Sequence, residues 1–131
     1  MVGFERSKKG VIRSYRDLLV WQKGMLLAED CYRVTSRFLK EETYGLVSQM
    51  RRASVSIPSN IAEGHGRENT GSFVQHLRIA QGSLEELETQ ALLCERVGLS
   101  PGETVAQLLT STDELGKMLR ALIRSLQDAP A

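Results

Sequence analysis

Aromatic residues and cysteines are scarce in this chain. Phe, Trp and Tyr make up 5% of the 131 residues, whereas the abundant Leu, Ala, Glu, Gln and Arg favour helix over strand. The two cysteines, Cys31 and Cys94, form no C-x-x-C pair, and we expect both to be small, reduced core residues. Because the sequence has no secretory signal and no apolar run of membrane-spanning length, we expect a cytoplasmic protein that does not enter a membrane.

Residue patterns that are typical of enzymes are also missing. His65 and His76 are eleven residues apart and belong to no H-E-x-x-H or E-x-x-H pattern, so we expect no metal site. The glycines at 64 and 66 follow no strand, which a phosphate-binding loop requires. The sequence places no histidine or lysine beside Ser54, Ser56, Ser59 or Ser83. We therefore expect neither a cofactor nor enzymatic activity.

The net charge of +1 conceals an uneven distribution along the chain. Residues 1–67 carry 12 Lys/Arg against 7 Asp/Glu, a net +5, and residues 68–131 carry 5 against 9, a net −4. Either the two halves attract each other across helix contacts, or the first half presents a basic surface to an acidic partner.

The first helix is expected from about Tyr15 to about Arg37, because apolar residues recur there at spacings of three and four. Its expected core stripe is Leu18, Trp21, Met25, Ala28, Tyr32 and Thr35. A second apolar row beside this stripe makes the face unusually wide. The polar connection at residues 39–43 follows.

The second helix carries an apolar stripe from Val47 to Ile61 that runs straight through Pro58. A proline lacks the N–H of a helix interior and crowds the preceding turn, so we expect a kink rather than a break. The helix should stop at the pair Gly64 and Gly66, since glycines commonly end helices.

Two further helices are expected, joined by a short connection. The third begins at Asn69 or Thr70 and ends at Gly98. The fourth is expected to begin with a capping box formed by Ser100 and Glu103. Their core stripes are Phe73, Leu77, Ala80, Leu84, Leu87, Ala91 and Cys94, and Val105, Leu108, Thr112, Leu115, Leu119, Leu122 and Leu126.

These four amphipathic segments predict an all-α protein, an antiparallel up-down-up-down four-helix bundle over residues 15–127. Residues 1–14 are expected to form a mobile basic arm and residues 128–131 a frayed tail. The apolar faces of the first and fourth helices are wider than one bundle core needs, which indicates a homo-oligomer.

The polar side of the second helix allows two interpretations. Arg51 and Arg52 could form ion pairs with Glu85, Glu86 or Glu88 of the third helix, or together with Arg67 they could contact phosphates. Small residues are expected to let these two helices approach closely. They are Ala53, Ser56 and Ser59 on the second helix and Ala80, Gly82 and Ser83 on the third.

Long segments of the chain resemble the 23S rRNA intervening sequence proteins. The likeness covers roughly residues 14–127 and is carried by "SYRDLLVWQKG" (14–24), "YGLVSQMRRASVSIPSNIAEGHGR" (44–67) and "FVQHLRIAQGSLEELETQALLCERVG" (73–98). Where a proline commonly closes the first helix in the family, this chain has Leu39. The motif positions to which we assign a structural role are Pro58, Asn60, Glu63, Gly64, Ser83 and Glu86.

The resemblance implies a homopentamer of four-helix bundles with no known enzymatic activity. Some members are encoded within insertions in large-subunit rRNA genes, and similar proteins are accessory factors of diversity-generating retroelements that engage reverse transcriptase and nucleic acid. We therefore expect a non-enzymatic module that binds RNA or DNA or assists a reverse transcriptase. The alternative is a protein-directed scaffold with no nucleic-acid role. Candidate contact residues are Arg51, Arg52, Arg67, Lys8, Lys9 and Arg13.

Overall fold

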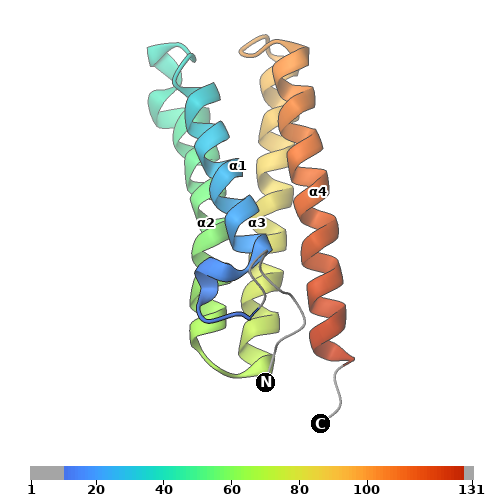
Figure 1. The fold of residues 1–131 in the computed structure, drawn as a ribbon. Helices are drawn as coiled ribbons and strands as arrows, with labels where there is room; N and C mark the ends of the chain where they lie inside the picture. The colour runs from blue at the N-terminus through green and yellow to red at the C-terminus, as the bar shows by residue number, and fades with distance from the viewer. Residues whose placement is uncertain (1–10, 129–131) are drawn as a thin grey trace.

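The computed structural model of the protein describes residues 11–128, without the side chain of Thr43, and within this range it contains four long helices and no strand (Figure 1). The long helices are α1 (Leu19–Thr35), α2 (Ser48–Gly66), α3 (Thr70–Arg96) and α4 (Gly102–Gln127). The expected all-helical, four-helix fold is confirmed. Lys8 and Lys9 of the expected arm, and residues 129–131 of the expected tail, lie outside the described residues.

Each helix packs against its neighbours in the chain, and α1 also contacts α4, so the four helices enclose one core. The α1–α2 and α3–α4 connections lie at one end of the molecule and the α2–α3 connection at the other (Figure 1). Every residue of the stripes expected for α3 and α4 is buried. Periodicity therefore located the core faces of both helices correctly.

The start and the core face of the first helix differ from the expectation. Residues Tyr15–Asp17 form a separate 3-10 turn, η1, because Leu18 is extended with ψ 128°. In α1 the expected stripe members Met25 and Tyr32 are 38% and 44% exposed. The buried residues of α1 are Val20, Gly24, Leu27, Ala28, Cys31 and Thr35. Small residues thus face α2, and the larger ones that dominated the pattern lie at the edge of the contact.

The connection between α1 and α2 is longer and more structured than the expected polar loop. It contains a 3-10 turn, η2 (Lys40–Glu42), and a π-helical turn, η3 (Thr43–Val47), in which Gly45 leaves helical geometry. The side chain of Glu42 accepts a hydrogen bond from the backbone N–H of Leu46. The α1 helix also ends earlier than expected, at Thr35 rather than about Arg37.

The α2 helix continues through Pro58 to Gly66, so the proline does not break it, as expected. Of the two glycines expected to end the helix, only Gly66 lies at its end. Gly64 is buried against α3, where a Cβ added to it would lie 2.5 Å from Cβ of His76 and 3.2 Å from Cδ1 of Phe73. Gly64 therefore permits a close approach of two helices.

The α3 helix begins and ends as expected. Asn69 is its N-cap and accepts a hydrogen bond from the N–H of Ser72 at 3.0 Å, and Gly98 has the left-handed φ of 78° that ends helices. The capping box expected for α4 is wrong. Pro101 occupies the cap with extended geometry, which places Ser100 one residue too early, and no side chain caps this helix.

The two kinds of helical glycine lead to a matched prediction. Gly64→Ala should lower the free energy of unfolding by about 1–3 kcal/mol, because the added methyl group overfills the contact with α3. Gly82→Ala should instead raise it by roughly 0.5–1 kcal/mol, because Gly82 is exposed and an added Cβ meets nothing within 4 Å. Urea unfolding of both variants measures the difference. A Gly64→Ala protein as stable as the Gly82→Ala protein would contradict the close approach.

Candidate functional site

An apolar groove lies open to solvent between α1 and α2. It encloses about 640 Å³ and is lined by Tyr15, Trp21, Met25, Ala28, Glu29, Tyr32, Arg33, Val55, Pro58, Ser59 and Ala62. Val55 on its wall is 43% exposed, and the rings of Tyr15 and Trp21 meet edge to face with centroids 5.3 Å apart. Contiguous exposed apolar surface of this kind marks interaction sites in soluble proteins.

Small residues produce the groove. A Cβ added to Gly24 would lie 3.5 Å from Ile57 and Pro58, at ordinary van der Waals distance, so α1 and α2 are separated by about one methyl group along this line. Beyond that line the groove is lined by Ala28 and Ala62, which are too short to fill the space between the helices. The larger side chains stand at its rim. The sequence had assigned these residues to the core, because hydrophobicity alone does not show which of two neighbouring rows faces inward.

Arg51 is held by the end of α1 and not by the acids of α3. Its Nε donates to Oγ1 of Thr35 at 2.9 Å, one terminal nitrogen donates to the carbonyl of Tyr32 at 3.3 Å, and the guanidinium carbon lies 4.4 Å from the centre of the Tyr32 ring. A cation at the C-terminal end of a helix complements its dipole. The sequence allowed an ion pair of Arg51 with Glu85, Glu86 or Glu88 within one chain or between copies, and the pair within one chain is wrong.

Arg52 lies on the other side of α2, toward α3. Ser83 Oγ donates to Ser56 Oγ at 2.8 Å and fixes the register of the two helices. This register puts Arg52 and Glu86 on neighbouring turns, where both are exposed and no ion pair joins them among the described residues. The ion pair expected for Arg52 is therefore absent among the described residues of one chain.

The small residues that were expected to meet between α2 and α3 do so in part. Ala53 and Ala80 are buried, and Ser56 contacts Ser83. Ser59 is exposed and lines the groove toward α1 instead. The outer face of Gly82 is open, so it brings no helix closer.

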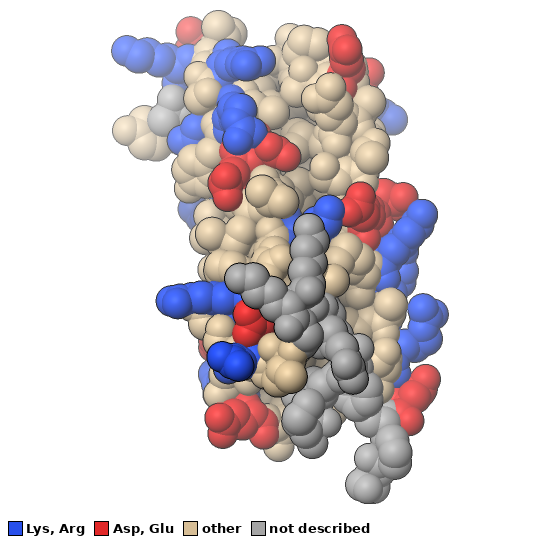
Figure 2. Space-filling model, in the orientation of Figure 1, with Lys and Arg blue, Asp and Glu red and all other residues tan. Residues whose placement is uncertain are grey.

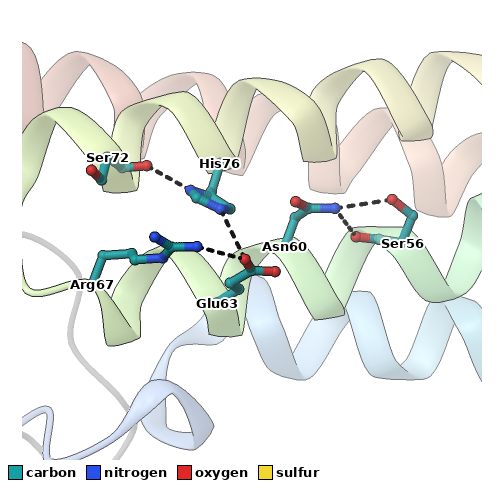
Figure 3. A network of polar contacts seen from close by, with 6 residues as sticks. All are labelled: Ser56, Asn60, Glu63, Arg67, Ser72 and His76. Atoms are coloured by element: carbon teal, nitrogen blue, oxygen red, sulfur yellow. Dashed lines mark hydrogen bonds and ion pairs between the residues drawn. The ribbon is translucent and has the colours of Figure 1, made fainter.

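A polar network joins the end of α2 to the start of α3 (Figure 3). Glu63 Oε2 accepts from Arg67 at 3.0 Å and lies 3.4 Å from Nε2 of His76, whose Nδ1 lies 2.9 Å from the carbonyl of Ser72. The Arg67 hydrogen bond, followed by that of His76, lowers the pKa of the Glu63 carboxyl. A lowered carboxyl pKa stabilises the folded state at pH values above the pKa that the carboxyl has in the unfolded chain. This stabilisation is lost as the pH falls through the pKa of the folded state.

One turn earlier on α2, the side chain of Asn60 bonds within its own helix. Its Nδ2 donates to the carbonyl of Ser56 at 2.8 Å and to the hydroxyl of Ser56 at 3.0 Å (Figure 3). The same hydroxyl accepts from Ser83, so Asn60 orients a group that links α2 to α3. Asn60, Glu63 and Gly64 thus all act at this helix contact.

The candidate nucleic-acid residues do not form one surface in the structure. Arg51 and Arg67 are 16 residues apart on α2, which corresponds to about 24 Å along the helix axis. Arg67 is held by Glu63, and Arg13 is exposed near η1 at the start of the described chain. The structure therefore separates Arg51 from Arg67.

The sequence interpretation missed a basic region at the end of α1. Arg33 and Arg37 line a second hollow of about 230 Å³ between α1 and α4, and Lys40 follows in η2. Figure 2 shows several basic side chains over the α1–α2 side of this end, with acidic ones beside them and over the α3–α4 side. Asp30 pairs with Arg33 there, and Glu41 and Glu42 follow Lys40 in η2, so acidic side chains also lie in this region. The sequence could have indicated this region, because Arg33 and Arg37 are four residues apart and therefore share one face of a helix.

Both cysteines are core residues, as expected. Burial raises the pKa of the Cys31 thiol, and chiefly burial raises that of Cys94 to about 11. Cys94 Sγ lies 3.5 Å from the sulfur of Met50. Thiols with raised pKa values are poor nucleophiles, so neither cysteine has the properties of a reactive one. Over residues 11–128 no group of three acidic, histidine or cysteine side chains could hold a metal ion.

Among the described helices, none combines the length and the apolar character that crossing a membrane requires.

Comparison with known proteins gives one family and one fold. A family model described as 23S rRNA-intervening sequence protein matches residues 16–121. A crystal structure of a protein of unknown function from the S23 ribosomal protein family of Bacteroides thetaiotaomicron is similar to this chain, with a TM-score of 0.76 and 22% identity. The match covers 81% of this chain and 96% of that one. No curated protein matches.

The contacts of Arg51 predict a structural role for this residue. Arg51→Ala should lower the free energy of unfolding by about 1–2 kcal/mol, because the carbonyl and hydroxyl at the end of α1 lose their donor and the Tyr32 ring loses its cation. Arg52→Ala, at an exposed position one residue away, should change it by less than about 0.5 kcal/mol. Urea unfolding at neutral pH compares the two. Equal effects would contradict the anchoring of Arg51.

Proposed function

Because the chain belongs to the 23S rRNA-intervening sequence protein family, we propose that it is a non-enzymatic cytoplasmic scaffold built from several copies of an antiparallel up-down-up-down four-helix bundle. The observation that carries this proposal is the open apolar groove between α1 and α2. The number of copies follows the family resemblance, which implies a pentamer. The scaffold binds other proteins, and the first of these are further copies of the same chain.

The composition of the groove supports an interface. Trp, Tyr and Met are enriched where proteins meet, and the groove gathers the single Trp of the chain with two of its three Tyr and one of its four Met residues. Single exposed apolar residues need no explanation, but a continuous set around one hollow does. Burying this set against another protein removes apolar surface from water, which is the main driving force for association.

A second candidate function is that of a nucleic-acid or reverse-transcriptase accessory protein. The basic region at the end of α1 favours it, because Arg37 and Lys40 are exposed there and an assembly would repeat the region in every copy. The arginines that first suggested this function support it less. Two of them, Arg51 and Arg67, make contacts within the bundle.

The scaffold proposal predicts an assembly that depends on the groove. Light scattering at micromolar concentration should give a mass several times the 14.6 kDa of one chain. Met25→Glu should reduce this mass toward that of a monomer, because it places a charge in the groove. Leu26→Glu is the matched control, since Leu26 is more exposed than Met25 and lies outside the groove. A wild-type monomer, or equal effects of both changes, would contradict the proposal.

Titration with random-sequence single-stranded RNA across a salt series separates the two candidate functions. For a protein-directed scaffold we expect only weak binding, at or above roughly 10⁻⁶ M at physiological salt. An accessory protein for nucleic acid requires tighter binding that weakens with salt. The logarithm of its binding constant should fall with the logarithm of the salt concentration, with a slope of about −0.7 for each phosphate contacted. In that case Arg37→Ala and Arg52→Ala should weaken binding without changing stability, since both side chains are exposed.

A further inference from the structure

We propose that the groove of one copy receives the outer face of α3 of the next copy, so that two different surfaces meet head to tail. This inference rests on the proposed self-association and names the surface that fills the groove. We call the second surface the α3 stripe and define it by Ile79, Gly82, Glu86, Leu93 and Val97.

The α3 stripe is apolar and exposed. Ile79, Leu93 and Val97 are 47%, 46% and 59% exposed, and an added Cβ on Gly82 would meet nothing within 4 Å. The five positions are separated by three, four, seven and four residues, so they share one side of the helix and its end. No other part of the described chain covers this stripe. Its exposed apolar side chains lie on both sides of a glycine, where a neighbouring helix has room to approach.

Charge disfavours contact between two α3 stripes. The first half of the chain, which contains the groove, carries a net +5, and the half that contains α3 carries a net −4. The stripe includes Glu86 and has Glu85 beside it, whereas the groove is lined by one base, Arg33, and one acid, Glu29. Two stripes facing each other would bring the acidic residues Glu85 and Glu86 of both copies together, which like charge disfavours. Groove against stripe avoids this repulsion, because the groove lining carries one base and one acid.

The positions of the two surfaces allow every copy to use both at once. Ile79 and Glu86 lie about one turn to either side of Ser83, whose hydroxyl contacts α2, so the α3 stripe borders α2. The groove lies on the other flank of α2, against α1. The two surfaces therefore occupy neighbouring sides of the bundle and do not overlap. Contacts between different surfaces repeat from copy to copy and close into a ring when the rotation permits.

Cysteine cross-linking tests the pairing directly. Met25→Cys places a thiol in the groove and Ile79→Cys places one on the stripe, while the native Cys31 and Cys94 are 0% and 1% exposed. We expect the double variant to form a ladder of covalent oligomers with a short bismaleimide, and each single variant to form none. Circular dichroism confirms that each variant keeps its helices.

A second measurement does not depend on cross-linking. Ile79→Glu should weaken the assembly at least tenfold in light scattering, as Met25→Glu does, whereas Leu92→Glu should not. Leu92 is similarly exposed, at 44%, but it lies on the same helix outside the stripe.

The outcomes separate this inference from the proposed function. Dimers from the Met25→Cys protein alone would show groove against groove and overturn the head-to-tail pairing while leaving self-association intact. An assembled double variant without any cross-link would overturn the pairing in the same way. A wild-type monomer would overturn both proposals.

Discussion

The close approach of α2 to both of its neighbours is the constraint on which the rest of this structure depends. On the α1 side, a Cβ added to Gly24 would lie 3.5 Å from Ile57 and Pro58, at ordinary van der Waals distance, so the space between the two helices there is that of one methyl group. On the α3 side, Gly64 leaves no room for even one added carbon beside His76. Packing at this distance increases the number of van der Waals contacts, each of which contributes little by itself. It also fixes the register, which the hydroxyl pair of Ser56 and Ser83 maintains.

The open groove is a consequence of this packing. When small residues form the centre of a helix contact, the large residues next to them are displaced to its edges. Trp21, Met25 and Tyr32 are in that position on α1, and Val55 is on α2. These side chains remain apolar and incompletely covered in a single chain. The placement of small residues at the centre of the contact and large ones at its edge thus stabilises the bundle and also leaves an apolar surface that another protein can cover. Fold and proposed assembly follow from one arrangement of small and large residues.

Much of the fold could be predicted from the sequence, and the failures share a physical cause. The stripes of α3 and α4, the Asn69 cap and the Gly98 stop depend on local periodicity and local hydrogen bonds, and all were located correctly. The core face of α1 depends on which row of residues lets α2 approach, which is a property of two helices and not of one. The partner of Arg51 depends on the same placement. Sequence spacing correctly put Arg51 near a partner helix, but it could not show that this helix is α1.

The segment Ser56–Arg67 illustrates why a pattern that resembles a binding loop can be structural. Pro58 is buried beside Gly24, Asn60 orients the hydroxyl of Ser56, and Glu63 and Gly64 both meet His76. These four residues make their contacts within the bundle, so the segment is accounted for without a bound phosphate. Arg51 is held within the bundle, whereas Arg67 forms a surface pair with Glu63. Arg52, Arg37 and Lys40 are among the exposed cations that have no ion pair within the described chain.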